Sequence, residues 1–342
     1  MNFMVDIDIK KLTEQINYKD KILLAGSCFT EHIGNALEEL KFSVLQNPNG
    51  ILFDPVSVCK SLVSYIRNTK YSEDDLFQLN EVWHSWQHHS RFSNIDKKEG
   101  IRVINESQQR ALDFLKEADW IIITLGSSFS YQLQAGHSQK AGSSEVSSFG
   151  GRFGGGSPIV TGPPPNGSNK HLLEIDTIIS ELDNCYHQLL RFNPKLNIIF
   201  TVSPVRHIRD GVIENNRSKA RLIEAVHHLV NKFDRLHYFP AYELVIDVLR
   251  DYRFYDIDLV HPNYMATEFV LEKFSLTAID ENTRELMQEI KQIVIARKHK
   301  AFQPDTKAHQ QFFKNKFEKV KLLQEKYPFI DLKRELIYFS QA

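Results

Sequence analysis

A serine near the start of the chain and an aspartate and a histidine near its far end have the residue types of an acyl-transfer site. Ser27 follows a short apolar run and opens the helix-like stretch 29–40. Asp258 stands three residues before His261 on a short segment that precedes another helical pattern. A serine hydroxyl attacks an ester carbonyl efficiently only when a base lies within hydrogen-bond reach and a third group orients that base. The sequence therefore offers a candidate Ser-His-Asp triad.

The order Ser, Asp, His resembles that of the SGNH (GDSL-like) hydrolase superfamily, which carries its serine after the first strand and an Asp-x-x-His motif near the domain end. The tetrapeptide Gly26-Ser27-Cys28-Phe29 is similar to the N-terminal signature of the GSCFA family within that superfamily. The resemblance extends from Lys21 to about Phe269. It implies a serine hydrolase acting on an acyl ester, such as an acylated carbohydrate or a small-molecule ester.

Two neighbouring residues compete for these roles. Cys28 is a rival nucleophile beside Ser27, but a residue on the other side of a tight turn more often packs inward as a small apolar group. Asp256 is a second candidate acid. We favour Asp258 because its three-residue offset from His261 matches the superfamily motif.

Acyl transfer also needs hydrogen-bond donors for the developing oxyanion. The resemblance assigns this role to the backbone N–H groups of Ser27 and Gly50, although the Asn-Gly pair that contains Gly50 forms tight turns in many proteins. The third superfamily block usually reads Gly-x-Asn. Here Ser128 stands where the asparagine would be, and its shorter hydroxyl is a weaker candidate donor.

Other polar side chains are candidates for the substrate pocket. Arg206 and His207 follow a predicted buried strand, where they could bind an anionic or hydroxylated substrate; alternatively, the arginine pairs with a nearby acid. The family resemblance places His89 in the pocket wall. His84 and His88 have the i, i+4 spacing of metal ligands on a helix, but no carboxylate lies between them. We therefore predict no metal and no other cofactor.

Short apolar runs alternate with helical patterns, which is typical of parallel strands joined by crossover helices. The pattern predicts an α/β fold with three α/β/α layers and a mostly parallel, flavodoxin-like sheet over 1–280, followed by a helical extension over 281–342. Ligands bind outside the carboxyl ends of such strands, where Ser27 and Gly126 fall. The predicted strands are 21–25, 42–46, 120–125, 196–201 and 237–239. The predicted helices are 29–40, 55–68, 106–118, 172–192, 219–233, 281–302 and 306–327.

The segment 135–169 interrupts the resemblance, because it is dense in Gly, Ser and Pro. Its ordinary interpretation is a long loop or lid. A sharper hypothesis is a frameshift: a DNA that encodes 158–168 can, one nucleotide out of phase, encode the Asn-Cys-His element that the GSCFA family carries shortly after the third block. Resequencing the gene would test it, and a genuine shift would impair catalysis.

The composition bounds the remaining possibilities. With 342 residues, 42% of them hydrophobic, the chain can bury a large core. A net charge of -1 favours neither nucleic acid nor an anionic membrane as a partner. The N-terminus lacks a signal-peptide pattern, and the three scattered cysteines suit a reducing compartment, so we expect a cytoplasmic protein.

The alternatives to a serine hydrolase are a non-catalytic binding protein using the same cleft and a His-ligated metal hydrolase. The C-terminal helices are a candidate contact for a homo-oligomer.

Overall fold

A five-stranded parallel sheet forms the centre of the computed structural model, which describes residues 5–133, 168–299 and 305–341. The strand order is β2-β1-β5-β8-β9, and every pair in this sheet is parallel. This is the flavodoxin-like order, so the predicted fold class is confirmed. The strands are β1 (Lys21–Gly26), β2 (Ser43–Gln46), β5 (Trp120–Leu125), β8 (Asn197–Val202) and β9 (Leu236–Tyr238).

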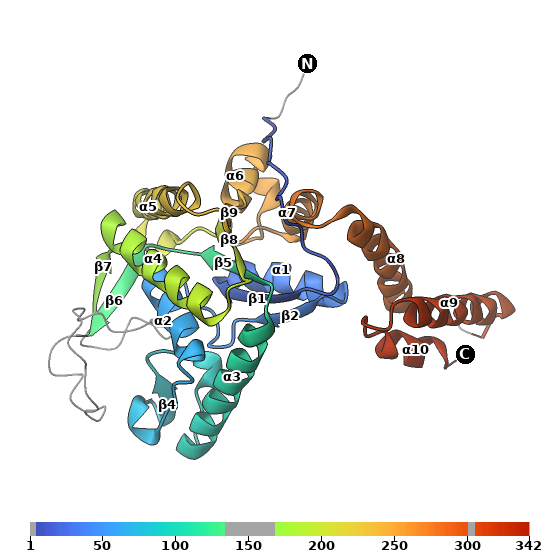
Figure 1. Ribbon diagram of the computed structural model, residues 1–342, viewed down its shortest axis with the longest axis horizontal. Helices are drawn as coiled ribbons and strands as arrows, with labels where there is room; N and C mark the ends of the chain where they lie inside the picture. Colours follow the sequence, from blue (N-terminus) through green and yellow to red (C-terminus); the bar gives the residue numbers. More distant parts are fainter. Residues whose placement is uncertain (1–4, 134–167, 300–304, 342) are drawn as a thin grey trace.

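Helices cover both faces of the sheet, which gives three layers (Figure 1). Alternate strand residues point to opposite faces. Ile22 and Leu24 of β1 therefore pack into the core on one face of the sheet, and Leu23 and Ala25 pack into the core on the other face. The helices that share the first core are α1 (Cys28–Glu39), α7 (Tyr264–Ala278) and α8 (Glu281–Lys298). The helices that share the second core are α2 (Pro55–Ile66), α3 (Lys97–Glu117), α4 (Ile175–Phe192) and α5 (Val212–Val230).

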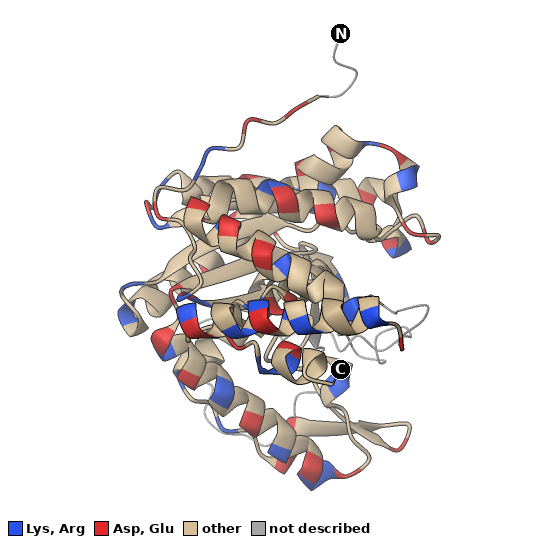
Figure 2. Ribbon diagram, turned by 90° about the vertical axis from the view of Figure 1, so that its right-hand side faces the viewer, with Lys and Arg blue, Asp and Glu red and all other residues tan. Residues whose placement is uncertain are grey.

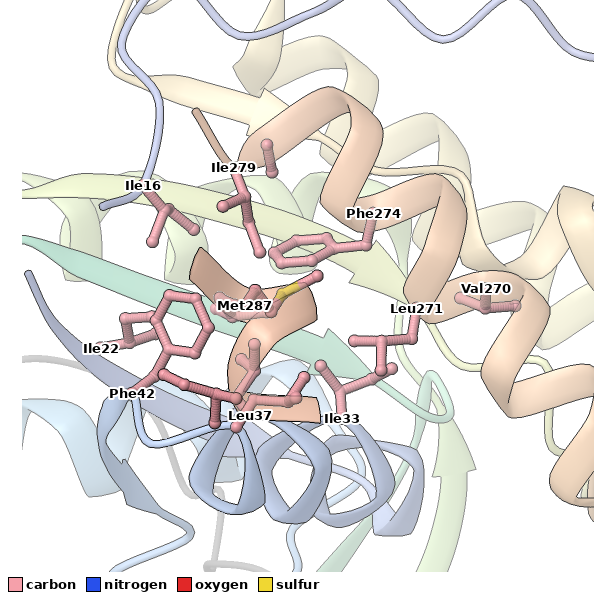
Figure 3. Packing of buried hydrophobic residues seen from close by; sticks show 14 of the residues in the cluster. Ile16, Ile22, Ile33, Leu37, Phe42, Val270, Leu271, Phe274, Ile279 and Met287 are labelled. Carbon is pink, nitrogen blue, oxygen red and sulfur yellow. The ribbon is translucent and has the colours of Figure 1, made fainter. Parts of the chain in front are cut away.

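The first core joins the N-terminal part of the chain to the helices that follow His261. Figure 3 shows Ile33 of α1 beside Leu271 of α7, with Leu37 of α1 and Met287 of α8 in the same cluster. All four side chains are buried. This packing fixes α1, and therefore the turn that precedes it, against the segment that carries the predicted histidine.

Several elements differ from the prediction. Helix α3 starts at Lys97 and not at 106, because the Asp96 side chain accepts hydrogen bonds from the first free N–H groups of the helix. Two antiparallel hairpins were not predicted: β3 (Leu76–Leu79) with β4 (Val82–Ser85), and β6 (Phe129–Leu133) with β7 (Ser168–Leu172). The second hairpin flanks the Gly/Ser/Pro-rich segment. Residues 134–167, and with them nearly all of the proposed frameshift, lie outside the described residues.

The C-terminal helices extend to one side of the sheet domain (Figure 1). After α8 come α9 (Lys307–Lys326) and α10 (Lys333–Phe339). Glu335 of α10 is fully buried, and its carboxylate lies 2.7 Å from the Lys41 Nζ and 3.2 Å from the Arg297 Nε. This ion triad therefore joins α10 both to α8 and to the turn between α1 and β2.

Basic and acidic residues are interspersed along the surface helices (Figure 2). Their mixing agrees with the near-zero net charge of the sequence. Within the described ranges, no helix is both long enough and apolar enough to cross a bilayer.

Candidate active site

The carboxyl ends of three neighbouring strands meet at one edge of the sheet. Gly26 at the end of β1 is in register with Thr124 of β5, and Thr124 is in register with Thr201 of β8. The backbone N–H of Ser27 donates to the Thr124 carbonyl at 3.0 Å. The β1–α1 turn therefore continues directly from the sheet, at the edge where such folds bind ligands.

A glycine is required at the first position of this turn. Gly26 has a φ of +138°, which side chains of L-residues rarely adopt, and a Cβ there would lie 2.1 Å from the Thr124 carbonyl oxygen. Gly126, the residue after β5, is confined to a lesser degree, because its Cβ would meet the Phe53 ring at 2.9 Å and the Ser27 Cβ at 3.2 Å. The two glycines bring the ends of β1 and β5 close together.

Asp258 and His261 form one compact hydrogen-bonded loop. One Asp258 carboxylate oxygen accepts from the backbone N–H groups of Val260 and His261, at 2.9 and 3.0 Å. The other lies 2.6 Å from His261 Nδ1. Asp256 instead uses its backbone, donating its N–H to the His261 carbonyl at 2.8 Å. The structure therefore brings together the two residues that the Asp-x-x-His motif indicated and holds the imidazole by Nδ1, so Nε2 is left to exchange a proton.

Arg206 supports this loop. Its guanidinium lies over the ring of Tyr255, 4.1 Å from the centroid, and also donates to the Leu259 carbonyl at 3.2 Å. Its backbone N–H donates to the Val260 carbonyl. The predicted alternative, an arginine paired with an acid, is replaced by stacking on an aromatic ring. Arg206 thus holds the loop of His261, and its contacts leave less of the guanidinium for a substrate.

Cys28, the first residue of α1, and Asp258 both shift the protonation of His261. The pKa of His261 is raised to about 9, first by its interaction with the Cys28 side chain and then by Asp258. Backbone and side-chain hydrogen bonds from His261 lower the pKa of Asp258 to about 2. At neutral pH these values give a carboxylate beside an imidazolium. The histidine therefore contacts the residue after Ser27.

Ser27 itself is turned into the protein. Its side chain is fully buried, and its Oγ has no hydrogen-bond partner among the described residues. The site that a Gly126 Cβ would occupy lies 3.2 Å from the Ser27 Cβ and 3.4 Å from His207 Nε2. The predicted hydrogen bond from Ser27 to His261 is not among those that the described residues form.

His207 lies on the inner side of the same edge. Its ring packs edge-on against Phe53, its backbone N–H donates to the Asn215 side chain, and burial lowers its pKa to about 3. His207 is therefore neutral at pH 7, and its buried Nε2 has no hydrogen-bond partner among the described residues.

The predicted oxyanion donors already have other partners. The Ser27 N–H donates to Thr124, and the Gly50 N–H donates to the Asn47 carbonyl at 2.7 Å and closes its turn. The Ser128 hydroxyl donates to the Ser218 carbonyl at 2.9 Å on α5. In this conformation none of the three is free for an oxyanion, because each meets a hydrogen-bonding need of the fold.

Lys219 is part of the site although its role was not predicted from the sequence. This lysine of α5 is almost fully buried, and its ammonium donates to the carbonyls of Gly126 and Ser203 at 2.6 Å each. Burial lowers its pKa to about 7, and Cys28 raises it in part. The sequence did contain a signal for the burial of Lys219, because this residue has helical spacing with the buried Leu222 and Val226. The lysine binds together the ends of β5 and β8 beneath the site.

The histidines of the unusual stretch 84–89 have structural partners. His84 is on strand β4, with Nδ1 2.7 Å from the Ser93 hydroxyl, and His88 follows that strand, with Nδ1 2.8 Å from the Ser85 hydroxyl. They are therefore not on one helical face. His89 packs against the turn of Gly50, whose Cβ would lie 2.1 Å from the His89 Cβ. No group of three or more metal-ligating side chains occurs within the described ranges.

Comparison with known families and structures gives two regions of similarity. The sequence model described as "GSCFA family" matches residues 21–274, and the one described as "GSCFA domain protein, C-terminal domain" matches residues 290–342. No curated protein matches the chain.

Two of the solved structures that match are a carbohydrate esterase family 3 protein from Talaromyces cellulolyticus and a mutant acetyl esterase with an acetate ion. Each has 10% sequence identity, covers 80% of this chain and 99% of the other, and gives a TM-score of 0.35. Similarity at this level does not inform the activity of the chain.

Proposed function

The chain belongs to the GSCFA family, and we propose that it is an acyl-ester hydrolase. In this proposal His261 transfers the proton of the nucleophile, and Asp258 orients the His261 imidazole. The observation that carries this proposal is the 2.6 Å contact between Asp258 and His261 Nδ1, in a loop that lies against the β1–α1 turn. A carboxylate fixed on one imidazole nitrogen sets the tautomer and leaves the other nitrogen for acid-base work. The nucleophile comes from the turn 26–28, where the sequence points to Ser27.

The N-terminus of α1 is the best candidate to stabilise the oxyanion. Ser27 is the N-cap residue, and its side chain makes no capping hydrogen bond. Within the described part of the chain, no hydrogen bond is formed by the backbone N–H groups of Cys28 and Phe29. Free N–H groups and the positive end of the helix dipole both favour negative charge at this position. These donors replace the three that the superfamily resemblance suggested.

The substrate that this chemistry requires is an ester of a small acyl group, with an alcohol or a hydroxylated carbohydrate as leaving group. The neutral His207 suits hydroxyl groups better than an anion. The Arg206 guanidinium is engaged by the Tyr255 ring and by the Leu259 carbonyl. Both observations favour an uncharged ester over an anionic one.

The test is turnover of p-nitrophenyl acetate by the full chain and by two variants, His261→Asn and Asp258→Asn. Loss of the proton-transfer group costs about 100-fold or more in rate. We expect both variants to lose turnover while keeping the circular dichroism spectrum of the parent. Glu325→Gln, a change on the exposed face of α9, is the control. A wild-type chain without turnover on acetyl, butyryl and acylated-sugar esters would contradict the proposal, as would full activity in His261→Asn.

One observation favours a second function, a binding protein that uses the same cleft. The predicted donors Ser27 N–H, Gly50 N–H and Ser128 Oγ are all occupied within the fold. A non-catalytic protein would bind acetylated ligands without releasing an alcohol. Isothermal titration with the same esters separates the two functions, since heat of binding without product supports the second.

A further inference from the structure

We propose that the thiol of Cys28, and not the hydroxyl of Ser27, is the nucleophile that His261 and Asp258 activate. This inference rests on the proposed acyl transfer and changes the class of the enzyme from a serine to a cysteine hydrolase. It assigns a catalytic role to Cys28, which the sequence alone favours less than Ser27.

Exposure distinguishes the two candidates. Cys28 is partly exposed, whereas Cys59, Cys185 and the Ser27 side chain are buried. A nucleophile must bring its reacting atom to about 3 Å from a substrate carbonyl. The fully enclosed Ser27 Oγ cannot do so without opening the turn, which the hydrogen bond from the Ser27 N–H to the Thr124 carbonyl holds closed.

The face of α1 distinguishes them further. Cys28 and His32 are four residues apart and therefore lie on the same side of the helix. Both interact with His261: the imidazole contacts the Cys28 side chain, and its charge helps burial to lower the pKa of His32. Cys28 and Val260 also pack against the same core cluster. Both residues on this side of α1 therefore interact with His261.

The contact with His261 suits a thiol nucleophile. The Cys28 side chain is the first cause of the raised pKa of His261, so the imidazole and the sulfur interact directly. A thiol that gives its proton to a neighbouring histidine forms a thiolate-imidazolium pair, in which the thiolate is the attacking species. Asp258 stabilises the imidazolium, and the N-terminus of α1 stabilises negative charge on the sulfur.

The reaction then balances without a cofactor. The Cys28 sulfur attacks the ester carbonyl, an S–C bond forms, and the oxyanion collapses with cleavage of the C–O bond to the alcohol. His261 gives its proton to the leaving alkoxide. Water next attacks the thioester while His261 takes its proton; the S–C bond breaks, and the carboxylic acid leaves as the thiolate-imidazolium pair is restored. The net reaction is ester plus water to acid plus alcohol.

Alkylation tests the activated thiol without any substrate. The full chain is treated with iodoacetamide at pH 7, and the rates at the three cysteines are read by peptide mass spectrometry. We expect Cys28 to react at least about tenfold faster than in His261→Asn, because that variant lacks the proton acceptor. The buried Cys59 and Cys185 are internal controls for folding. Equal Cys28 rates in both proteins would overturn the proposal, whatever the esterase activity.

Turnover then identifies the attacking atom. We expect Cys28→Ala and Cys28→Ser to lose p-nitrophenyl acetate turnover by about 100-fold or more, because alanine has no nucleophile and a serine hydroxyl gives up its proton far less readily than a thiol. Cys185→Ser, a buried cysteine on α4, is the matched control. A greater loss in Ser27→Ala than in Cys28→Ala would refute the inference while leaving the hydrolase proposal standing. If the wild-type chain shows no turnover but Cys28 is alkylated rapidly in a His261-dependent way, the ester substrate is refuted and the assignment of Cys28 as nucleophile stands.

Discussion

Replacing Glu335 by glutamine tests how the C-terminal helices are held. The carboxylate is fully buried and lies within 3.2 Å of two cations, Lys41 and Arg297, whose side chains are only 15% and 12% exposed. The substitution keeps the shape of the side chain but removes its charge. Both cations are then left unpaired in a region that water reaches poorly.

The expected cost follows from that burial. Removing one member of a buried ion pair destabilises a protein by about 3 to 5 kcal/mol, and the slight exposure of the two cations favours the lower end. For a chain of this length we take about 2 °C per kcal/mol, so 3 kcal/mol corresponds to a melting temperature lower by about 6 °C.

Differential scanning calorimetry of the full chain measures this shift. Glu325→Gln is the control, because it makes the same chemical change on the exposed side of α9, where surface charges contribute at most about 1 kcal/mol. Glu335→Gln and Glu325→Gln with melting temperatures equal within error would refute the reasoning, since the triad would then contribute nothing beyond a surface charge.

Three further predictions concern the site. By NMR, His261 titrates near pH 9 and lower in Asp258→Asn. Because its folded pKa lies above the unfolded value of 6.5, the interactions of His261 with Cys28 and Asp258 stabilise the fold fully below pH 6.5, and this stabilisation is lost as pH rises through 9. An unchanged titration in the variant would contradict the contact. Gly26→Ala lowers the free energy of unfolding by about 2 kcal/mol or more in urea titrations, because its Cβ meets the Thr124 carbonyl; a neutral change would contradict this. Lys219→Met leaves two buried carbonyls without a donor and costs about 1 to 3 kcal/mol each by the same assay; unchanged stability would show that water replaces the ammonium.

The sheet was predictable because its signal is local. Continuous apolar runs such as 120–125 and 196–201 mark strands buried on both faces, and the helical patterns between them leave a parallel topology as the simple solution. The hairpin of β3 and β4 was missed because its strands are short and partly exposed. The start of α3 was missed because the capping role of Asp96 was not recognised.

The site was predictable only in part. The spacing of Asp258 and His261 is local, so their hydrogen bond follows from the motif. The orientation of the β1–α1 turn is not local: it depends on the approach of Thr124 to Gly26, which directs Ser27 inward and leaves the next residue facing the histidine loop. The spacing of residues along the sequence does not predict how closely Thr124 approaches Gly26.

The most direct test of the central claim is a rapid-quench measurement of p-nitrophenol release, with the acetyl group located afterwards by peptide mass spectrometry. We predict a burst of about one equivalent per chain, with the acetyl group on Cys28 and no burst in His261→Asn. An equal burst in that variant, or an acetyl group on a peptide without residues 26–28, would contradict the claim that His261 activates a nucleophile in this turn.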